Sequence, residues 1–236
     1  MHERNCFVTL TYDEEHIPND WSLRVEDWQK FMKRLRKRYG EGIRFYHCGE
    51  YGDENGRPHY HGLIFNHDFV DRRPWKKGPR HAIDISGELQ ELWTDGFSTV
   101  GNVSFESAAY VARYQLKKIT GEKADEHYEF MVPDTGEIVH RKPEYATMSR
   151  RPGIGDPWFE KFAADAYPSD YIIMRGRKMR PPKYYESKVE ELLLRHLRVG
   201  RARMGRKLSV DNTVDRRRVR EKVKIAQIKQ LKRNLK

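Results

Sequence analysis

The stretch "GEYGDENGRPHYHGLIF", residues 49–65, decides the fold of this 236-residue chain. It holds two runs that are typical of β-strands, and Asn55-Gly56 stands between them. This dipeptide is among the strongest signals for a two-residue hairpin turn, because both residues tolerate the left-handed backbone that such a turn requires. We therefore predict an antiparallel hairpin whose strands meet at this turn.

Three candidate metal ligands come together on the predicted hairpin. A two-residue turn sets Glu50 opposite His61 and Gly52 opposite His59. Directly opposed residues share one face of a sheet, so both histidines and the glutamate lie on the same side. The glycine would leave room for an ion or a substrate beside His59. An odd slip in register would instead move Glu50 to the other face.

This ligand set favours a catalytic rather than a structural metal. Two imidazoles and one carboxylate form an incomplete coordination shell with open positions. Imidazole suits zinc, but a set that is open to water and phosphate oxygens also serves Mg²⁺ or Mn²⁺, which we expect here. The alternative is that two histidines at i and i+2 are ordinary polar positions of a strand. The facing glutamate weighs against it.

The segments on either side of the hairpin complete an α+β pattern. Hydrophobic periodicity predicts strands at 6–12, 43–51, 59–65 and 97–105, and helices at 24–39, 88–93 and 107–119. The first six of these elements follow one another as β-α-β-β-α-β. That order is typical of the ferredoxin-like split fold, an antiparallel sheet with helices on one face. The last helix follows the fourth strand.

A second constellation of reactive side chains lies in the last of these helices, "AAYVARYQLKK" at 108–118. At about 100° per residue, Tyr110, Tyr114, Lys117 and Lys118 share one face of a helix. Ammonium groups beside a phenol favour its ionised form and also attract phosphate, so the set suits a tyrosine nucleophile. The alternative is an amphipathic helix that buries its tyrosines, although core aromatic residues seldom share a face with two lysines.

The net charge of +11 is unevenly distributed. Residues 195–236 hold sixteen basic and three acidic residues, whereas residues 1–194 hold thirty and thirty-two. Such a tail is often a solvated helix or a flexible arm, but it can also hold nucleic acid phosphates. The candidate contacts are Arg216, Arg217 and Arg218 in the tail and Arg150 and Arg151 before a Pro-Gly turn. Solvated surface arginines are the alternative in both places.

Composition excludes several other classes of protein. No apolar run approaches the roughly 18 residues of a membrane span, and no secretory signal follows Met1, so we expect no membrane partner. Two cysteines in separate predicted strands fit a reducing cytoplasm. The phosphate-binding loop GxxxxGK[S/T] is absent, so nothing indicates a fused helicase.

Three segments together resemble a known family. The motifs "FVTLTY" (7–12), "GEYGDENGRPHYHGLIF" (49–65) and "YVARYQLKK" (110–118) resemble those of HUH endonucleases of the two-tyrosine branch. The chain looks most like the replication initiators of gokushoviruses, which are single-stranded DNA phages of the microvirus group. "MSRRPGIGDPWFEKF" (148–162) is similar to a further segment of those initiators. Such initiators often begin further upstream with a cysteine-containing stretch, so we expect that an upstream segment is missing.

The resemblance implies initiation of rolling-circle replication in the cytoplasm of a bacterial host. Glu50, His59 and His61 would hold the cation, and one tyrosine would attack the scissile phosphate of the single-stranded viral origin. The product is a 5′-phosphotyrosine link and a free 3′ hydroxyl, from which a host polymerase, aided by a host helicase, starts synthesis. The second tyrosine would nick the completed unit while the first link is resealed.

The expected organisation is an HUH endonuclease domain at 1–165, a connecting segment at 166–194 and a basic tail at 195–236. Two alternatives belong to other functional classes. One is a hydrolytic metal-dependent nuclease, in which water attacks and the tyrosines only stack on bases. The other is a basic DNA-binding or packaging protein without chemistry, which would leave the histidine and tyrosine sets unexplained.

Overall fold

The fold was obtained as a computed structural model, which describes residues 1–77, 82–113 and 118–230. These residues divide into two compact units, one from His2 to Ile154 and another that begins at Gly155. The fold is of the α+β class with a large antiparallel sheet, as predicted from the sequence. No helix among the described residues has both the length and the apolar character that crossing a bilayer requires.

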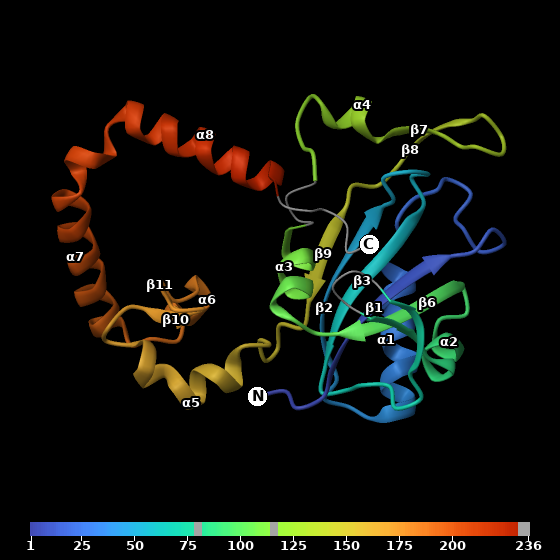
Figure 1. Cartoon of the computed structure of the whole chain (residues 1–236), viewed down its shortest axis with the longest axis horizontal. Coiled ribbons are helices and arrows are strands. Elements are labelled where there is room, and N and C mark those ends of the chain that lie inside the picture. Colours follow the sequence, from blue (N-terminus) through green and yellow to red (C-terminus); the bar gives the residue numbers. More distant parts are fainter. Residues whose placement is uncertain (78–81, 114–117, 231–236) are drawn as a thin grey trace. The chain divides into compact units, whose positions relative to one another are not determined.

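The first unit is built on a seven-stranded sheet in the order β4-β5-β6-β1-β3-β2-β9 (Figure 1). Each strand pairs antiparallel with its neighbours. The strands are β1 (Asn5–Tyr12), β2 (Arg44–Tyr51), β3 (Pro58–Phe65), β4 (Arg73–Lys77), β5 (Ala82–Ile85), β6 (Gly96–Asn102) and β9 (Tyr145–Met148). The four strands predicted from the sequence are therefore the central ones, and β6-β1-β3-β2 is their order.

One face of this sheet carries the main core. Helix α1 (Val25–Tyr39) has its buried side chains at helical spacing, at Trp28, Phe31, Met32 and Leu35, and α2 (Gly87–Leu92) adds Leu89 and Leu92. They pack on alternate residues of the central strands, such as Leu10 and Tyr60. A β-carbon at Gly62 would lie only 2.2 Å from the Trp28 ring, so glycine is what allows α1 to approach β3 this closely.

The opposite face carries a smaller cluster under a single helix. Helix α3 (Phe105–Arg113) packs Tyr110 and Val111 against Cys48 of β2 and Leu63 of β3. Because side chains alternate along a strand, the residues between those of the main core point to this face. The two faces thus divide the work: one is a packed core, and the other is where polar side chains of β2 and β3 gather.

The structure corrects the predicted register of the central hairpin. Asn55-Gly56 is not a two-residue turn, because β2 and β3 are joined by residues 52–57 and Gly52 donates its N–H to the carbonyl of Arg57 at 3.0 Å. Glu50 therefore lies opposite His59, and Cys48 lies opposite His61. The shift from the predicted pairing is an even one, so Glu50 keeps its predicted face. Gly52 is not opposite His59 and leaves no room there.

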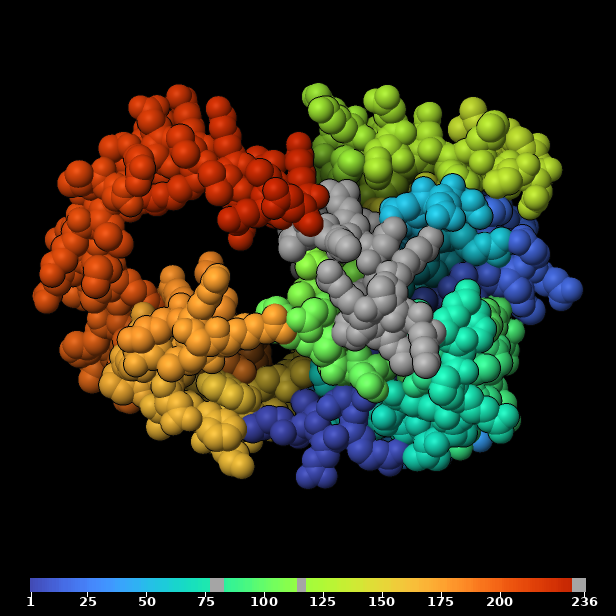
Figure 2. Space-filling view, in the orientation of Figure 1, coloured from blue at the N-terminus to red at the C-terminus, as the bar shows by residue number. Residues whose placement is uncertain are grey.

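Strands β4, β5 and β9 extend the sheet beyond the predicted four. After α3, helix α4 (Ala124–Tyr128) leads into a separate hairpin of β7 (Glu129–Met131) and β8 (Ile138–His140). Phe130 of β7 packs against Gly56 of the β2–β3 connection, whose carbonyl accepts a 3.0 Å hydrogen bond from Arg141. Figure 2 shows the yellow-green surface of this excursion against the light-blue surface of the connection.

The second unit is small and mostly helical. Its elements are α5 (Asp156–Ala166), β10 (Ile172–Met174), β11 (Arg177–Met179), α6 (Lys183–Glu186), α7 (Glu191–Lys207), a 3-10 helix (Ser209–Asn212) and α8 (Val214–Gln230). Tyr167, Tyr185 and Leu197 form its core. Arg201 of α7 pairs with Asp170 at 2.6 Å and with Glu186 at 2.8 Å. Helix α8 buries none of its residues, so the basic tail is helical and solvated along α8.

Candidate metal centre and nucleophile

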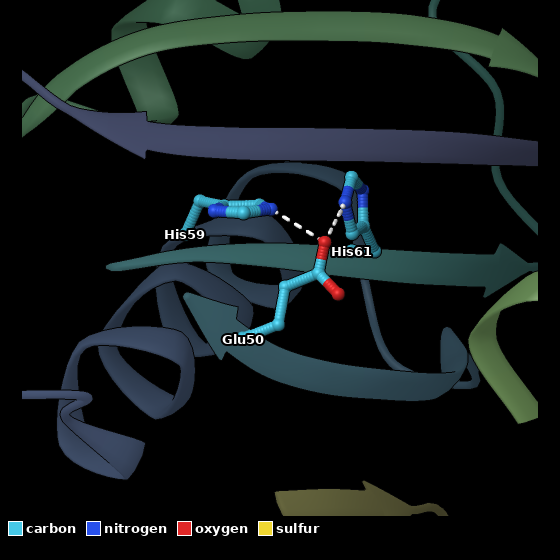
Figure 3. A group of neighbouring side chains, drawn as sticks. All are labelled: Glu50, His59 and His61. Atoms are coloured by element: carbon cyan, nitrogen blue, oxygen red, sulfur yellow. Dashed lines mark hydrogen bonds and ion pairs between the residues drawn. The ribbon is translucent and has the colours of Figure 1, made fainter. Parts of the chain in front are cut away.

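The two central strands bring Glu50, His59 and His61 together (Figure 3). Their ligand atoms all lie within 4.8 Å of one another. The Nε2 atoms of His59 and His61 lie 2.6 and 3.0 Å from the same carboxylate oxygen, Oε1 of Glu50. Glu50 is supplied by β2 and the histidines by alternate positions of β3, so the pairing of these strands alone sets the geometry.

Neighbouring groups fix which ring nitrogen of each histidine faces the centre. Nδ1 of His59 lies 3.1 Å from the carbonyl of Arg57. A carbonyl can only accept, so this nitrogen carries the hydrogen and Nε2 remains for an ion. Nδ1 of His61 lies 2.9 Å from the hydroxyl of Thr9, and the ring of Phe7 stacks on His61 with centroids 5.5 Å apart. Both Nε2 atoms are therefore held toward Glu50.

The electrostatics of the cluster favour an ionised carboxylate. Burial would raise the pKa of Glu50, but hydrogen bonds from His59 and His61 and their charge outweigh burial and lower the pKa to about 2. Only 4% of the Glu50 side chain is exposed, against 15% for His59 and 10% for His61. The three side chains fit a divalent cation, because they present two imidazole nitrogens and one anionic oxygen to a single point.

Tyr110 stands beside this cluster. Its hydroxyl lies 3.5 Å from both Oε1 of Glu50 and Nε2 of His61. Its ring meets the His61 ring edge-on, with centroids 5.1 Å apart, and the residue is 6% exposed. Helix α3 thus delivers a phenol to the point where the three candidate ligands converge, as the "YVARYQLKK" motif predicts for Tyr110.

The other predicted members of the tyrosine set stand differently. Tyr114 and Lys117 lie outside the described residues. The prediction of a helical Lys118 is wrong: α3 ends at Arg113, and Lys118 is an exposed residue without regular structure. The chain departs from helical bonding there, since the next residue, Ile119, donates its N–H to the hydroxyl of Tyr128 at 3.1 Å.

The candidate DNA-contacting arginines belong to both units. Arg150 and Arg151 are exposed in the first unit, at a turn closed by a bridge from Arg150 to Gly153. The other three stand exposed at the start of α8: Arg216, Arg217 and Arg218. Arg216 pairs with Asp211 at 2.7 Å, so part of this charge is already compensated within the tail.

Sequence reasoning missed the part that β1 plays. Thr9 supports His61 through the 2.9 Å hydrogen bond described above, and Thr9 lies opposite His61 in the sheet. The alternation in "CFVTLTY" carried the signal, because its threonines occupy every second position between apolar residues. Such a pattern places Thr9 and Thr11 on the face opposite the main core.

Comparisons with known proteins agree on one class. A family of replication-associated proteins of the ORF2 type matches residues 5–119, which include Glu50, His59, His61 and Tyr110. No solved structure matches the chain. The fold and the site thus belong to a chain of the replication-associated class.

Phage proteins carry the resemblance further. Replication-associated protein VP4 of Bdellovibrio phage phiMH2K is 31% identical over 202 residues, which are 79% of this chain and 58% of that protein. ORF2 of Spiroplasma virus 4 is 31% identical over 80% of this chain and 58% of its own length, and ORF4 of Chlamydia phage 1 is 29% identical over 81% and 47%. The chain spans about half the length of these relatives. It is a relative of phage replication-associated proteins of the microvirus type, as its motifs indicate.

Proposed function

We propose that this protein is a replication initiator that nicks single-stranded viral origin DNA by attack of a tyrosine on phosphorus. The observation that carries the proposal is the position of the Tyr110 hydroxyl, 3.5 Å from both Glu50 and His61. A nucleophile and a set of cation ligands at that separation can act on one phosphate. The match to replication-associated proteins supports the same role.

The proposed reaction exchanges one ester for another. The phenolic oxygen of Tyr110 bonds to phosphorus while the bond from phosphorus to the 3′ oxygen breaks. The phenol loses its proton and the departing oxygen gains one, so a 5′-phosphotyrosine link and a free 3′ hydroxyl result. Glu50, His59 and His61 hold Mg²⁺ or Mn²⁺, which supplies polarisation of the scissile phosphate when bound. Tyr114 performs the second transfer, which reseals the circle without an external energy source.

Several finer assignments belong to this proposal. The strand order β6-β1-β3-β2 supports a split fold of the HUH type. We place the endonuclease domain at 1–165, the connecting segment at 166–194 and a DNA-holding tail at 195–236. Arg150, Arg151 and the arginines at 216–218 contact phosphates. A host polymerase and helicase extend the free 3′ end in the bacterial cytoplasm.

Loss of the covalent adduct tests the nucleophile. The protein is incubated with a circular single-stranded phage genome and Mn²⁺, and DNA-linked protein is resolved on a denaturing gel. We expect an adduct whose phosphotyrosine maps by mass spectrometry to residues 108–118. Tyr110→Phe and Tyr114→Phe each reduce it and the double variant abolishes it, whereas Tyr171→Phe, outside this segment, serves as the control. An adduct that survives in the double variant would place the nucleophile elsewhere.

Two other outcomes decide against the proposed reaction. Cleavage with a free 5′ phosphate and no linked protein would mean that water attacks, as in a hydrolytic nuclease. Binding without any cleavage, across genomes of several such phages, would mean a DNA-binding or packaging role.

A further inference from the structure

Two large aromatic side chains stand exposed on the sheet of the first unit. Trp75 of β4 and Phe97 of β6 are each 43% exposed, and their ring centroids lie 4.9 Å apart. All five tryptophans lie in the described ranges, and Trp75 alone among them is exposed. Packing of the two rings on one another covers only part of their surface. The pair therefore leaves flat apolar area open to a ligand.

The pairing of the strands places Phe97 in the same row as the candidate metal ligands. Phe97 lies opposite Thr11 of β1, Thr11 lies opposite His59 of β3, and His59 lies opposite Glu50 of β2. Directly opposed residues point to the same face. Phe97 is two strands from His59, which corresponds to about 10 Å at the usual strand spacing. The aromatic pair and the cluster thus share one continuous surface of the sheet.

A local irregularity of β4 accompanies the exposure of Trp75. The pairing of β4 with β5 shifts between Pro74 and Lys76, so Trp75 is the extra residue of a bulge. A bulge re-aims a side chain out of the regular alternation, and bulges are frequent at sheet edges and beside active sites. Here the re-aimed ring meets Phe97 on the face of the cluster.

Positive charge surrounds the two rings. Strand β4 reads RPWKK, with three basic residues and no acidic one. The Lys76 ammonium lies 4.1 Å from the centroid of the Trp75 ring, and Arg73 is also exposed. Aromatic faces beside basic side chains are the combination that binds single-stranded nucleic acid, because bases stack on the rings while phosphates meet the charges.

We propose that Trp75 and Phe97 form a stacking platform for a base of the single-stranded DNA that flanks the scissile phosphate. The proposal rests on the proposed function, since it assumes that the DNA strand crosses this face at the cluster. Lys76 and Arg73 hold the neighbouring phosphates. Stacking does not distinguish the bases strongly, so the platform contributes affinity and positioning rather than the recognition of a sequence.

Binding to DNA with and without bases tests the platform. The probes are fluorescein-labelled oligo(dT) of 30 nucleotides and an abasic strand of the same length, with the full chain in Mg²⁺. We expect the wild type to prefer oligo(dT), and the double variant Trp75→Leu, Phe97→Leu to lose affinity for oligo(dT) by roughly fivefold to a hundredfold. Its affinity for the abasic strand stays the same, because the basic side chains are intact.

Matched variants separate stacking from a general loss of structure. Trp75→Phe keeps an aromatic face and retains most of the preference for bases, whereas Trp75→Leu does not. Val70→Ala, at an 80% exposed position of the same unit, serves as the unaffected control. An unchanged preference in the double variant overturns the platform. Equal losses for oligo(dT) and the abasic strand overturn it as well, since they would indicate a role of charge or fold.

The adduct assay keeps this proposal apart from the proposed function. A double variant that loses base preference but still forms the adduct at saturating DNA supports the platform. A wild type that prefers bases through Trp75 and Phe97 but forms no adduct contradicts the proposed reaction and leaves the binding site standing.

Discussion

The oxygen Oε1 of Glu50 is shared by two imidazole nitrogens at 2.6 and 3.0 Å, so the three side chains behave as one unit. Each histidine is also held from behind, by the Arg57 carbonyl or by Thr9. Removal of any one member leaves the other two in place but opens the ligand set. The contribution of each side chain should therefore be visible in metal binding even where the fold is unchanged.

Metal affinity is the first quantity to measure. We expect His59→Ala and His61→Ala each to weaken Mn²⁺ binding at least tenfold by titration calorimetry, because each removes one of three ligands. Glu50→Gln should weaken it too, since an amide lacks the carboxylate charge. His196→Ala, on the exposed side of α7, is the control. Wild-type affinity in both histidine variants would exclude this cluster as the metal site.

His47, on the other face of β2, controls a different property. Its ring stacks on Trp28 with centroids 4.1 Å apart, and Nδ1 lies 3.0 Å from the Thr147 hydroxyl. Burial lowers the pKa of His47 to about 3, so the folded protein keeps the ring neutral in mild acid. The unfolded chain binds a proton near pH 6.5. Stability from this group is therefore complete above pH 6.5 and is lost progressively as the pH falls toward 3.

Urea unfolding at two pH values tests this linkage. Between pH 7 and pH 5 the wild type should lose about 2 kcal/mol of unfolding free energy through His47. His47→Gln cannot gain the proton, so it should be less stable at pH 7 but should decline less on acidification. Parallel declines in the two proteins would show that His47 titrates normally in the fold.

At the scale of elements, the connection between β2 and β3 is held by the β7–β8 excursion. The Arg141 guanidinium lies 3.9 Å from the ring centroids of both Tyr51 and Phe130, and it donates to the carbonyl of Gly56. Phe130 packs in turn on Trp21. A long connection that would otherwise be loose is thus fixed next to the strand that carries both histidines. This explains how a six-residue connection can keep a defined register.

Two glycines of this hairpin should respond oppositely to the same change. A β-carbon at Gly62 would lie 2.2 Å from the Trp28 ring, whereas at Gly52 the nearest atom is 3.6 Å away. We expect Gly62→Ala to lower the unfolding free energy by about 1–3 kcal/mol and Gly52→Ala to change it by less than about 0.5 kcal/mol. Denaturant titration followed by circular dichroism measures both. Equal effects would mean that α1 can move away from β3 at little cost.

The success of the sequence prediction followed the strength of the local signals. Apolar runs and helical spacing located β1, β2, β3, β6 and α1, and the alternation in β3 put both histidines on one face. The register was wrong by an even step because Asn55-Gly56 also fits inside a longer connection, which long-range packing of Phe130 and Arg141 stabilises. Strands β4 and β5 were missed because β4 is basic and bulged and carries no period-two pattern. The exposed Trp75 was missed for the same reason.

At the scale of the whole molecule, charge and chemistry lie in different parts of the chain. The candidate cluster is in the first unit, and the excess of basic residues is in the second. The structure also shows where the tail can be removed. Helix α7 buries Leu194 and Leu197 and ties Arg201 to Asp170, so a cut at residue 195 would damage the second unit. A cut after Leu208 removes only solvated segments of the described chain.

Deletion of residues 209–236 removes ten basic and three acidic residues. We expect weaker binding to all single strands and a shallower dependence of log affinity on log salt, by roughly 0.7 for each phosphate that the tail no longer neutralises. Cleavage at saturating DNA should continue at close to the full-length rate, because Glu50, His59, His61 and Tyr110 remain. A salt slope equal to that of the full chain would mean that α8 does not touch DNA.

The alternation of β3 between two faces has a consequence for how this protein can change over time. Within "PHYHGLIF", His59 and His61 serve the reaction face, while Tyr60 and Ile64 are fully buried in the core and Gly62 admits Trp28. Each ligand thus has core residues as its immediate neighbours in the sequence. A scan of all substitutions should show activity and abundance failing at alternate positions. Point changes can then adjust the chemistry without loss of the fold, whereas a single inserted or deleted residue in β3 exchanges the two sets and destroys both.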